Sequence, residues 1–390
     1  MARAVERPNL PVLTSLRFWA AALVVLNHLD TSRVDFLPGI IKGWCQSGYE
    51  AVTFFFVLSG FILTYVYSSS REDGSLNVPR RRFQIARLAR IGPAYYLALV
   101  LMLPAFIYGV AVAGIISLDR FVLATLAVPA LLQAWLPPVA FSWNGPAWSL
   151  SVEMCFYASF PYLLLQTTRV ARRDLVLAAA AAVVASAAIR ANAQSLLPGY
   201  STEWQYFFAY FPLFHVPSFV FGMALGRLFL FGRDRSPLGN QLSLVLASVV
   251  LALVLGFRSS LPAWFVSDAL LVPLYGVVIL AAAGMHSSTT GILASPVAVL
   301  AGEASYSMYI LHTPVVFWWH WIAARFFGLR LPHAVEVAVA FALVLVVSIF
   351  VFAMFERPLR RFIVQHVPDT PVHKATTADF PVSKTNVKSG

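Results

Sequence analysis

The sequence is poor in charge and in cysteine. Charged residues make up 12% of its 390 positions and hydrophobic residues 59%, whereas soluble globular chains carry about 25% charged residues. So little charge, together with several apolar runs near 20 residues, excludes an ordinary soluble domain and predicts an all-α polytopic membrane protein. The two cysteines, Cys45 and Cys155, exclude a disulfide framework and offer no Cys-x-x-Cys metal site, so no metal is expected.

Several functional motifs are also missing. The sequence has no Gly-x-x-x-x-Gly-Lys-Ser/Thr loop and no Gly-x-Ser-x-Gly elbow, which argues against a nucleotide hydrolase and a soluble-type serine hydrolase. The net charge of +11 is typical of nucleic-acid binding, but Lys and Arg collect in the cytoplasmic loops of membrane proteins for topological reasons. We therefore expect membrane lipids and no nucleic acid as partners.

The apolar runs predict about ten transmembrane helices with both termini in the cytoplasm. This arrangement places 20 of the 28 Lys and Arg residues inside, 7 outside and Arg17 within the first helix, in agreement with the positive-inside rule. The predicted spans are 13–30, 46–67, 91–108, 146–166, 174–191, 204–230, 239–257, 265–285, 295–321 and 334–355.

The stretch 116–135 is also apolar and would make an eleventh crossing. Counting it would move the basic clusters at 169–173 and 227–235 to the outer side, against the rule. We therefore predict that 109–145 is a re-entrant or interfacial element, with 136–146 able to line a substrate entrance. Residues 1–366 would form one transmembrane domain, and the polar segment 367–390 a disordered cytoplasmic tail.

Two ionisable residues, Arg17 and His28, lie inside the first apolar helix. Eleven residues apart, they fall on one helix face with about 16 Å between them along the axis. Ionisable groups in a spanning helix are costly and by default suggest function. A neutral imidazole at His28 can accept a proton from a hydroxyl, although a packing histidine that bonds a neighbouring helix explains the spacing equally well.

The basic run from Arg80 to Arg90 is the strongest electrostatic feature. Topology and anionic headgroups account for its first residues. Arg87 and Arg90 lie deeper in the apolar segment, three residues apart, and so share a helix face. This geometry favours a clamp on a phosphorylated ligand, with Arg82 as a further candidate.

Two later segments place polar residues inside predicted helices. Glu153 lies near the start of the fourth span, five residues after Trp148, and needs a buried partner; it either orients His28 or ties two helices together. The segment 302–314 contains Ser305, Tyr309 and His312, and the last two share one helix face. A second intramembrane histidine favours a proton-handling or acceptor site.

Together these blocks resemble the acyltransferase-3 family of membrane acyltransferases, which includes bacterial O-acetyltransferases of surface carbohydrates. Each block is weak alone, but seven occur in order along nearly the whole chain. The matching stretches are Arg17 with ten residues before His28, FFFVLSGF at 54–61, ARLARIGP at 86–93, WSLSVE at 148–153, VPSFVFGMALG at 216–226, SYSMYILHTP at 305–314 and FERPLRR at 355–361.

The resemblance implies a ten-helix core in the bacterial inner membrane, with cytoplasmic acyl-CoA, most often acetyl-CoA, as donor. The acceptor would be a hydroxyl of a glycan or glycolipid. His28 matches the family's essential histidine, Arg17 its paired arginine, and Arg87 and Arg90 the basic motif thought to contact the CoA phosphates. His28 would deprotonate the acceptor or briefly carry the acyl group.

Two other classes of function fit the same residues. A transporter or exporter of a lipid-linked glycan would use intramembrane His, Arg and Glu as a proton relay, although no paired broken helices are evident. A binding protein that has lost activity is the third reading. In the leading reading Arg17, Ser305 or Tyr309 stabilises the oxyanion, and His312 and Trp148 contact the acceptor.

Overall fold

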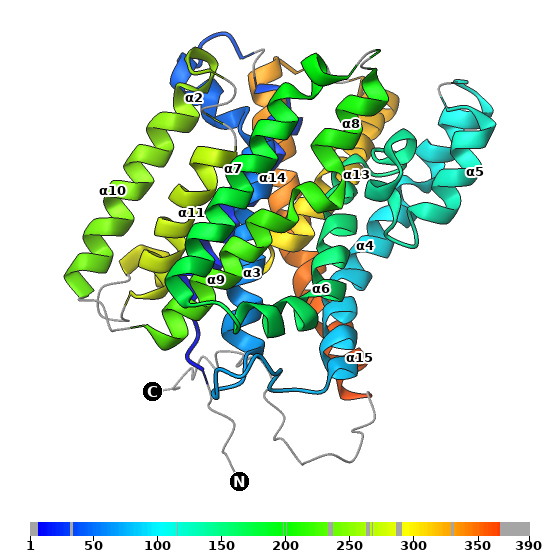
Figure 1. The fold of residues 1–390 in the computed structure, drawn as a ribbon. Helices are drawn as coiled ribbons and strands as arrows, with labels where there is room; N and C mark the ends of the chain where they lie inside the picture. Colours follow the sequence, from blue (N-terminus) through cyan, green and yellow to red (C-terminus); the bar gives the residue numbers. More distant parts are fainter. Residues whose placement is uncertain are drawn as a thin grey trace, which may run out of the picture.

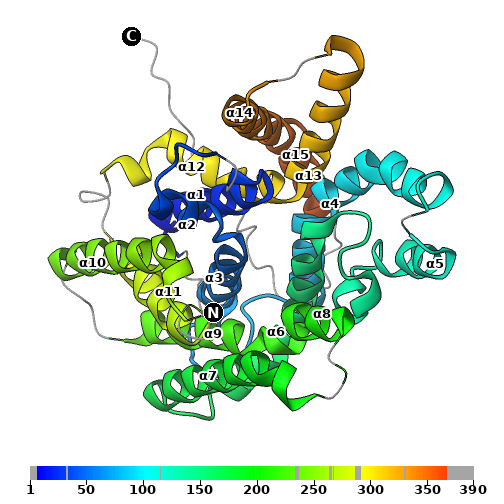
Figure 2. The ribbon, with the colours of Figure 1, turned by 90° about the horizontal axis from the view of Figure 1, so that it is seen from above.

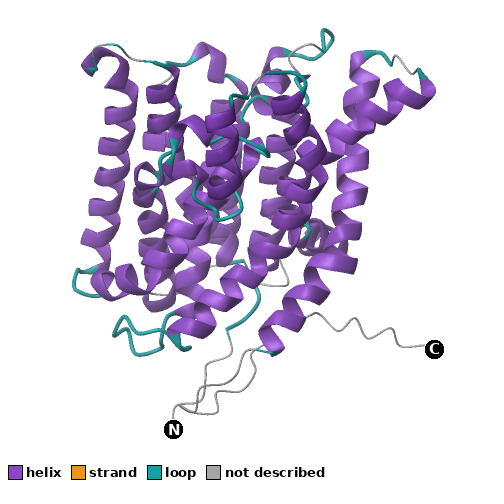
Figure 3. Cartoon of the chain, turned by 90° about the vertical axis from the view of Figure 1, so that its right-hand side faces the viewer, coloured by secondary structure: helices purple, strands orange, loops and turns teal. Residues whose placement is uncertain are grey.

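The computed structural model describes residues 7–31, 34–114, 116–197, 199, 201–232, 237–262, 266, 268–285, 291–328 and 331–366. Within these residues the chain is helical, and its only β contact is an isolated antiparallel bridge between Ser68 and Leu76. Figure 3 shows the long helices running between two ends of the molecule, with loops gathered at those ends. The predicted all-α class is confirmed, while the tail 367–390 lies outside the described residues.

Fifteen α-helices make up the described fold. They are α1 (Pro11–His28), α2 (Gly39–Cys45), α3 (Gly48–Tyr67), α4 (Arg80–Ala111), α5 (Leu118–Ala127), α6 (Trp148–Thr167), α7 (Arg172–Leu196), α8 (Thr202–Tyr210), α9 (Val216–Phe231), α10 (Pro237–Gly256), α11 (Asp268–Ala283), α12 (Pro296–Glu303), α13 (Ser305–Ile322), α14 (His333–Val351) and α15 (Arg357–Gln365).

Helix is present in each of the ten predicted spans, but only six described helical segments are long and apolar enough to cross a membrane. These six are Gly48–Tyr67, Arg80–Val110, Arg172–Ser195, Pro212–Phe231, Gly239–Gly256 and His333–Gln365. The protein is therefore a multi-pass membrane protein, whereas the count of ten and the orientation stay predictions.

Two predicted spans are not single helices. The range 204–230 divides into α8 and α9, because Phe211 precedes Pro212 and adopts an extended backbone with φ −62° and ψ 128°, as residues before proline do. The range 295–321 divides after Glu303 into α12 and α13. At Gly302 an added Cβ would lie 1.9 Å from the Thr14 carbonyl oxygen, so α12 turns there to pack closely on α1.

The region 109–145 does not form a full crossing. Its one α-helix, α5, has 10 residues and is about 15 Å long, half of the hydrocarbon core. Three short 3-10 turns follow between Gln133 and Ala147, and Figure 1 shows α5 standing beside the upper part of α4. This arrangement agrees with a re-entrant or interfacial element. The basic run belongs to α4 itself, which has 32 residues and begins at Arg80.

Helix α3 lies in the middle of the bundle. Figure 2 shows it surrounded by α1, α11, α9 and α6. Of an 18-residue stretch of α3, 72% is buried, against 28% for α7, α10 and the α14–α15 segment, which lie at the rim. The site-bearing helices α1, α4, α6 and α13 pack together on one side of α3.

The crossing of α3 and α9 is made by glycines. A Cβ added to Gly60 would lie 2.0 Å from the Phe219 carbonyl oxygen, and one added to Gly222 would lie 2.0 Å from the Val57 carbonyl oxygen. Small residues at helix crossings allow backbones to approach closely. Gly60 and Gly222 thus let α3 and α9 approach closely where they cross.

We expect Gly222→Ala to lower the free energy of unfolding by about 3 kcal/mol, because the added methyl group meets backbone that no rotamer change can move. Gly92→Ala is the matched control, since its Cβ would meet only the Tyr96 ring at 3.8 Å and alanine favours helix by about 1 kcal/mol. Thermal unfolding of the purified variants in detergent measures both. Equal midpoints would contradict the close crossing.

The first and last described segments lie at one end of the molecule. Arg7 donates hydrogen bonds to the carbonyl oxygens of Thr64 and Ser68 at 3.2 and 2.6 Å, and α15 packs against α4. We call this the basic end, because the start of α4, which carries the basic run, and helix α15 lie at the bottom of Figure 1. It is the end that the charge count predicts to be cytoplasmic.

Candidate active site

A buried ion pair joins α4 to the C-terminal part of the chain. Arg90 binds Glu356, whose side chain is fully buried, and the second carboxylate oxygen of Glu356 accepts a hydrogen bond from Ser307 at 2.6 Å. Glu356 ends a π-helical turn, Phe352–Glu356, which is a rare element that often marks functional sites. The Arg90 guanidinium also lies 5.3 Å from the centre of the Tyr306 ring.

One turn before Arg90, Arg87 is buried among aromatic rings. It donates a hydrogen bond to the Tyr67 hydroxyl at 3.0 Å, and its guanidinium lies 5.2 and 5.7 Å from the ring centres of Tyr67 and Tyr157. Its Nε has no hydrogen-bond partner among the described residues. A buried guanidinium with an unused donor fits a residue that completes its bonding with a ligand.

Arg17 and Glu153 belong to the same cluster. The Tyr157 hydroxyl donates to Glu153 at 2.6 Å, and Ser59 lies 3.5 Å from the same carboxylate oxygen. The Arg17 guanidinium interacts electrostatically with Glu153, Glu356 and Arg90. The structure therefore gives Glu153 its partners within the charged cluster, instead of beside His28.

Positive charge is in excess in this cluster. Arg17, Arg87 and Arg90 lie there with Glu153 and Glu356, and Arg360 interacts with Arg87, Arg90 and Glu356. The first three arginines share two carboxylates at low dielectric, and an anionic ligand would relieve the repulsion between them. Arg82, also predicted to bind the donor, is half-buried near the start of α4, and Arg80 stacks on Tyr162 with 4.7 Å between charge and ring centre.

Two histidines stand side by side farther from the basic end. The ring centres of His28, at the end of α1, and His312, in α13, are 4.7 Å apart. His28 Nδ1 lies 2.8 Å from the Val24 carbonyl oxygen, and His312 Nδ1 lies 2.7 Å from that of Tyr309. Because a carbonyl oxygen only accepts, both Nδ1 atoms carry the hydrogen, and in the neutral rings both Nε2 atoms are acceptors.

Next to the pair lies a hydroxyl dyad. Ser149 Oγ and the Tyr309 hydroxyl are 2.6 Å apart, and Tyr309 also donates to the Pro146 carbonyl oxygen at 2.8 Å. The Ser305 side chain is buried at the start of α13 and its Oγ has no partner among the described residues. The predicted group of Ser305, Tyr309 and His312 thus lies on one buried helix, with the last two beside His28.

Trp148 belongs to a second cluster of aromatic rings. Its ring packs against Tyr210 and His215, with ring centres 4.7 and 5.5 Å apart, and stacks on Tyr49. These rings border a second buried polar network, which joins Arg190 to Asp268. Neither Arg190 nor His215 is predicted from the sequence as a site residue. Arg190 is counted only as one of the seven outside charges, and the predicted site histidines are His28 and His312.

Other functional residues were overlooked for a definable reason. Glu356 lies just after the last predicted span and is named only within the matching stretch 355–361, and Tyr67 and Ser149 carry no charge. Glu50 is buried and paired with Arg258 at 2.5 Å. In the described part of the chain, no three His, Cys, Asp or Glu side chains are grouped as a metal site would need.

Comparison with known proteins identifies a family and several relatives of this chain. The sequence model of an acyltransferase domain matches residues 11–354. Acyltransferase MdmB of Streptomyces mycarofaciens is 29% identical over 92% of this chain and 91% of its own. Exopolysaccharide production protein ExoZ of Rhizobium meliloti is 29% identical over 80% and 90%. The putative peptidoglycan O-acetyltransferase YrhL of Bacillus subtilis is 24% identical over 79% of this chain and 48% of its own. No solved structure matches the chain.

Proposed function

This chain belongs to the acyltransferase-domain family and is therefore an enzyme that transfers acyl groups, and we propose that its reaction is O-acylation of a glycan. In this proposal an acyl group, in its simplest form acetyl, passes from cytoplasmic acyl-CoA to a hydroxyl of an envelope or exported glycan or glycolipid. His28 and His312 handle the acceptor, and the arginine cluster of Arg17, Arg87 and Arg90 holds the donor.

The histidine pair carries this proposal. Two neighbouring Nε2 atoms, both acceptors, face a site where the described residues supply no donor for His312 Nε2, which is buried. A hydroxyl group supplies the missing proton. The backbone carbonyls of Val24 and Tyr309 fix both tautomers, which keeps the imidazoles ready to accept a proton without reorganisation.

The reaction balances with these groups. His28 Nε2 takes the proton of the acceptor hydroxyl as the oxygen attacks the thioester carbonyl carbon. The carbon–oxygen bond forms, the carbon–sulfur bond breaks, and the departing CoA thiolate takes the proton back from the imidazolium. The Tyr309 hydroxyl contacts Ser149 and donates to the Pro146 carbonyl oxygen, and it serves the developing oxyanion when its one hydrogen turns from Pro146 to the substrate.

The charged cluster supports the donor assignment. Coenzyme A is a polyanion, and planar guanidinium groups suit its phosphates. Arg17 lies about 16 Å along α1 from His28, so one helix connects the cluster with the histidines. An acyl-pantetheine arm reaching from the cluster to His28 would follow the polar line of Glu153, Ser149 and Tyr309.

The relatives support a glycan acceptor. Two of those named above carry exopolysaccharide and peptidoglycan in their names, and the latter name specifies O-acetyl transfer. The alternative of a proton-driven transporter has no matching observation, because the same His, Arg and Glu residues are accounted for by acyl transfer.

Mass spectrometry of envelope polysaccharide and lipid tests the proposal. Cells with the intact gene should carry an ester on one sugar position that disappears when the gene is deleted and returns on complementation. Membranes from the complemented cells should also consume labelled acetyl-CoA only when that polysaccharide is present. Identical ester patterns with and without the gene would refute glycan O-acylation.

A further inference from the structure

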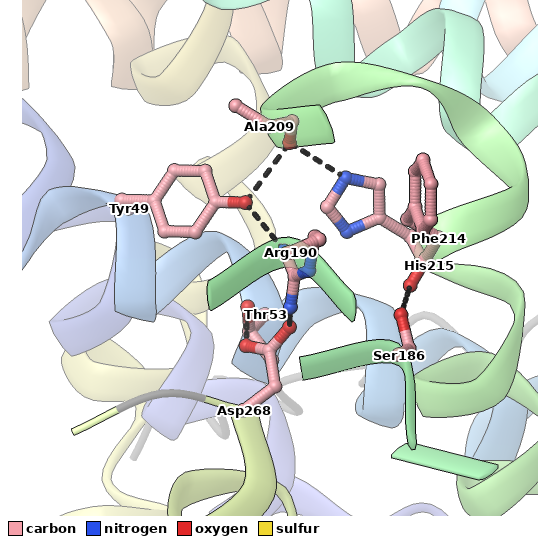
Figure 4. A network of polar contacts seen from close by, with 8 residues as sticks. All are labelled: Tyr49, Thr53, Ser186, Arg190, Ala209, Phe214, His215 and Asp268. Atoms are coloured by element: carbon pink, nitrogen blue, oxygen red, sulfur yellow. Dashed lines mark hydrogen bonds and ion pairs between the residues drawn. The ribbon is translucent and has the colours of Figure 1, made fainter. Parts of the chain in front are cut away.

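The network bordered by Trp148 lies among α3, α7, α9 and α11 and is drawn in Figure 4. Arg190 binds Asp268 and donates to the Tyr49 hydroxyl at 3.0 Å, while Thr53 donates to Asp268 at 2.9 Å. Arg190 and Asp268 balance each other in charge, so the network does not call for an ionic ligand.

Helix α8 closes the network from above through a single carbonyl. Ala209 lies in the last turn of α8, where carbonyl oxygens have no N–H partner within the helix. Its carbonyl oxygen accepts a hydrogen bond from the Tyr49 hydroxyl at 2.9 Å. His215 Nε2 lies 3.0 Å from the same oxygen. Since the carbonyl only accepts, His215 carries its hydrogen on Nε2, which leaves Nδ1 as an acceptor in the neutral ring.

Two atoms of this network are left without partners. His215 Nδ1 and Arg190 Nε are buried, and neither has a hydrogen-bond partner in the described part of the chain. The His215 ring is 1% exposed, and it faces Arg190, with which it interacts electrostatically (Figure 4). His215 Nδ1 is an acceptor and Arg190 Nε is a donor, and we call these two atoms the orphans. Each missing hydrogen bond costs about 1–3 kcal/mol.

The chemistry of the two orphans defines what fits between them. An anion would satisfy the Arg190 N–H but brings no proton for His215, and a cation would satisfy neither. A hydroxyl group does both, because its oxygen accepts from Arg190 while its hydrogen goes to Nδ1. The smallest group that does so is a water molecule or an alcohol.

Aromatic rings favour an alcohol carried by a sugar. From His215 a run of rings leads outward through Trp148, Tyr210 and Phe141, with successive centres 5.5, 4.7 and 4.5 Å apart. Phe141 is 38% exposed. Aromatic walls with a few placed polar groups are typical of small-molecule sites, and ring faces pack well against the C–H faces of a sugar.

The run also adjoins the histidine pair. Trp148 is followed directly by Ser149, whose hydroxyl contacts Tyr309, and the Tyr309 carbonyl holds His312 beside His28. A sugar held at His215 would thus belong to the same acceptor chain as the sugar whose hydroxyl meets His28.

We propose that Arg190 and His215 form a hydroxyl-binding subsite for a sugar unit of the acceptor glycan, separate from the unit that is acylated. This inference rests on the proposed function. The subsite binds and positions the acceptor, takes no part in the bond changes, and does not contact the donor.

Two conservative variants remove one orphan each. His215→Gln keeps an N–H for the Ala209 carbonyl and moves the acceptor away from the position of Nδ1, because the amide oxygen is bonded to the same carbon as the N–H group. Arg190→Lys keeps a cation for Asp268 and loses the Nε–H. Ser186→Ala is the control, because Ser186 donates only to the Phe214 carbonyl oxygen at 2.9 Å nearby. The probes are labelled acetyl-CoA and polysaccharide extracted from cells that lack the gene.

For His215→Gln and for Arg190→Lys we expect the KM for polysaccharide to rise about tenfold, the value of one lost hydrogen bond of about 1.4 kcal/mol. The kcat and the KM for acetyl-CoA should match those of the control. The double variant should lose less than the product of the two single effects, since both residues hold one hydroxyl.

An unchanged KM for polysaccharide in both variants would overturn the proposal and leave only a buried water between the two atoms. A rise in both KM values together with a fall in thermal stability would overturn the proposal and indicate a structural role for the two residues. If wild-type protein transfers no acetyl group, the proposed function fails, and thermal unfolding with and without polysaccharide decides the subsite. Stabilisation by polysaccharide that disappears in His215→Gln supports it, and its absence in the wild type overturns it.

Discussion

Replacing His28 by alanine should reduce acyl transfer at least about a thousandfold, within the range that positioned general bases contribute. The substitution removes the Nε2 acceptor and leaves His312 alone beside the substrate hydroxyl. Because the arginine cluster lies about 16 Å away along α1, the KM for acetyl-CoA should stay within about twofold. Transfer of labelled acetyl groups to extracted polysaccharide, in membranes with matched protein levels, measures both quantities.

Asn27→Ala is the control for this result, since Asn27 is exposed, lies in the same turn of α1 and does not belong to the site. It should transfer acetyl groups at close to the wild-type rate. Retention of more than a tenth of the activity by His28→Ala would show that this histidine is not the base. Wild-type protein that takes up stable label from acetyl-CoA without acceptor, where His28→Ala does not, would replace the base mechanism with an acyl-histidine.

Removing the carboxylate of Glu356 should destabilise the protein by about 4 kcal/mol, as breaking a buried ion pair does. Glu356 is fully buried and binds both Arg90 and Ser307. Without it, Arg17 and Arg87 would keep Glu153, but Arg90 would lose its ion-pair partner. Thermal unfolding of Glu356→Ala in detergent measures the loss.

The same substitution at Glu203 provides the control. Glu203 pairs with Arg120 at 3.2 Å, but both side chains are more than half exposed, so Glu203→Ala should cost less than about 1 kcal/mol. Similar midpoints for the two variants would refute the buried cluster. Added coenzyme A should recover part of the Glu356→Ala loss if its phosphates lie among the arginines, and the absence of any recovery would argue against the donor assignment.

Spacing along the sequence predicted which site residues share one helix, but not which residues meet between helices. Arg87 and Arg90 share one side of α4, as their spacing required, and His312 and Tyr309 lie together on α13. Spacing within a helix is fixed by its pitch, so these groupings were accessible from the sequence. The partners across helices were not, so the sequence left Glu153 between orienting His28 and tying two helices together, whereas the structure places it beside Tyr157 and Ser59.

Two arginines that the positive-inside count places among its seven outside charges are ion-paired in the structure. Arg190 pairs with Asp268, and Arg258 pairs with Glu50. A count by sequence position records a charge but not its burial. Trp148 shows the same limit, since its neighbours Tyr210 and His215 are more than 60 residues away along the chain.

By itself, the sequence determined the class of the protein and indicated candidates for its reactive groups. The hydrophobic content leaves helices as the way to satisfy backbone hydrogen bonds in lipid, and the ordered motifs indicated the acyltransferase family that comparison then showed. Only the tertiary structure decided how those groups pair. Packing α1 on α13 brings His28 to His312, and packing α7, α9 and α11 on α3 creates the Arg190–His215 subsite. Such contacts join residues up to hundreds of positions apart, and their geometry depends on helix crossings that local spacing does not encode.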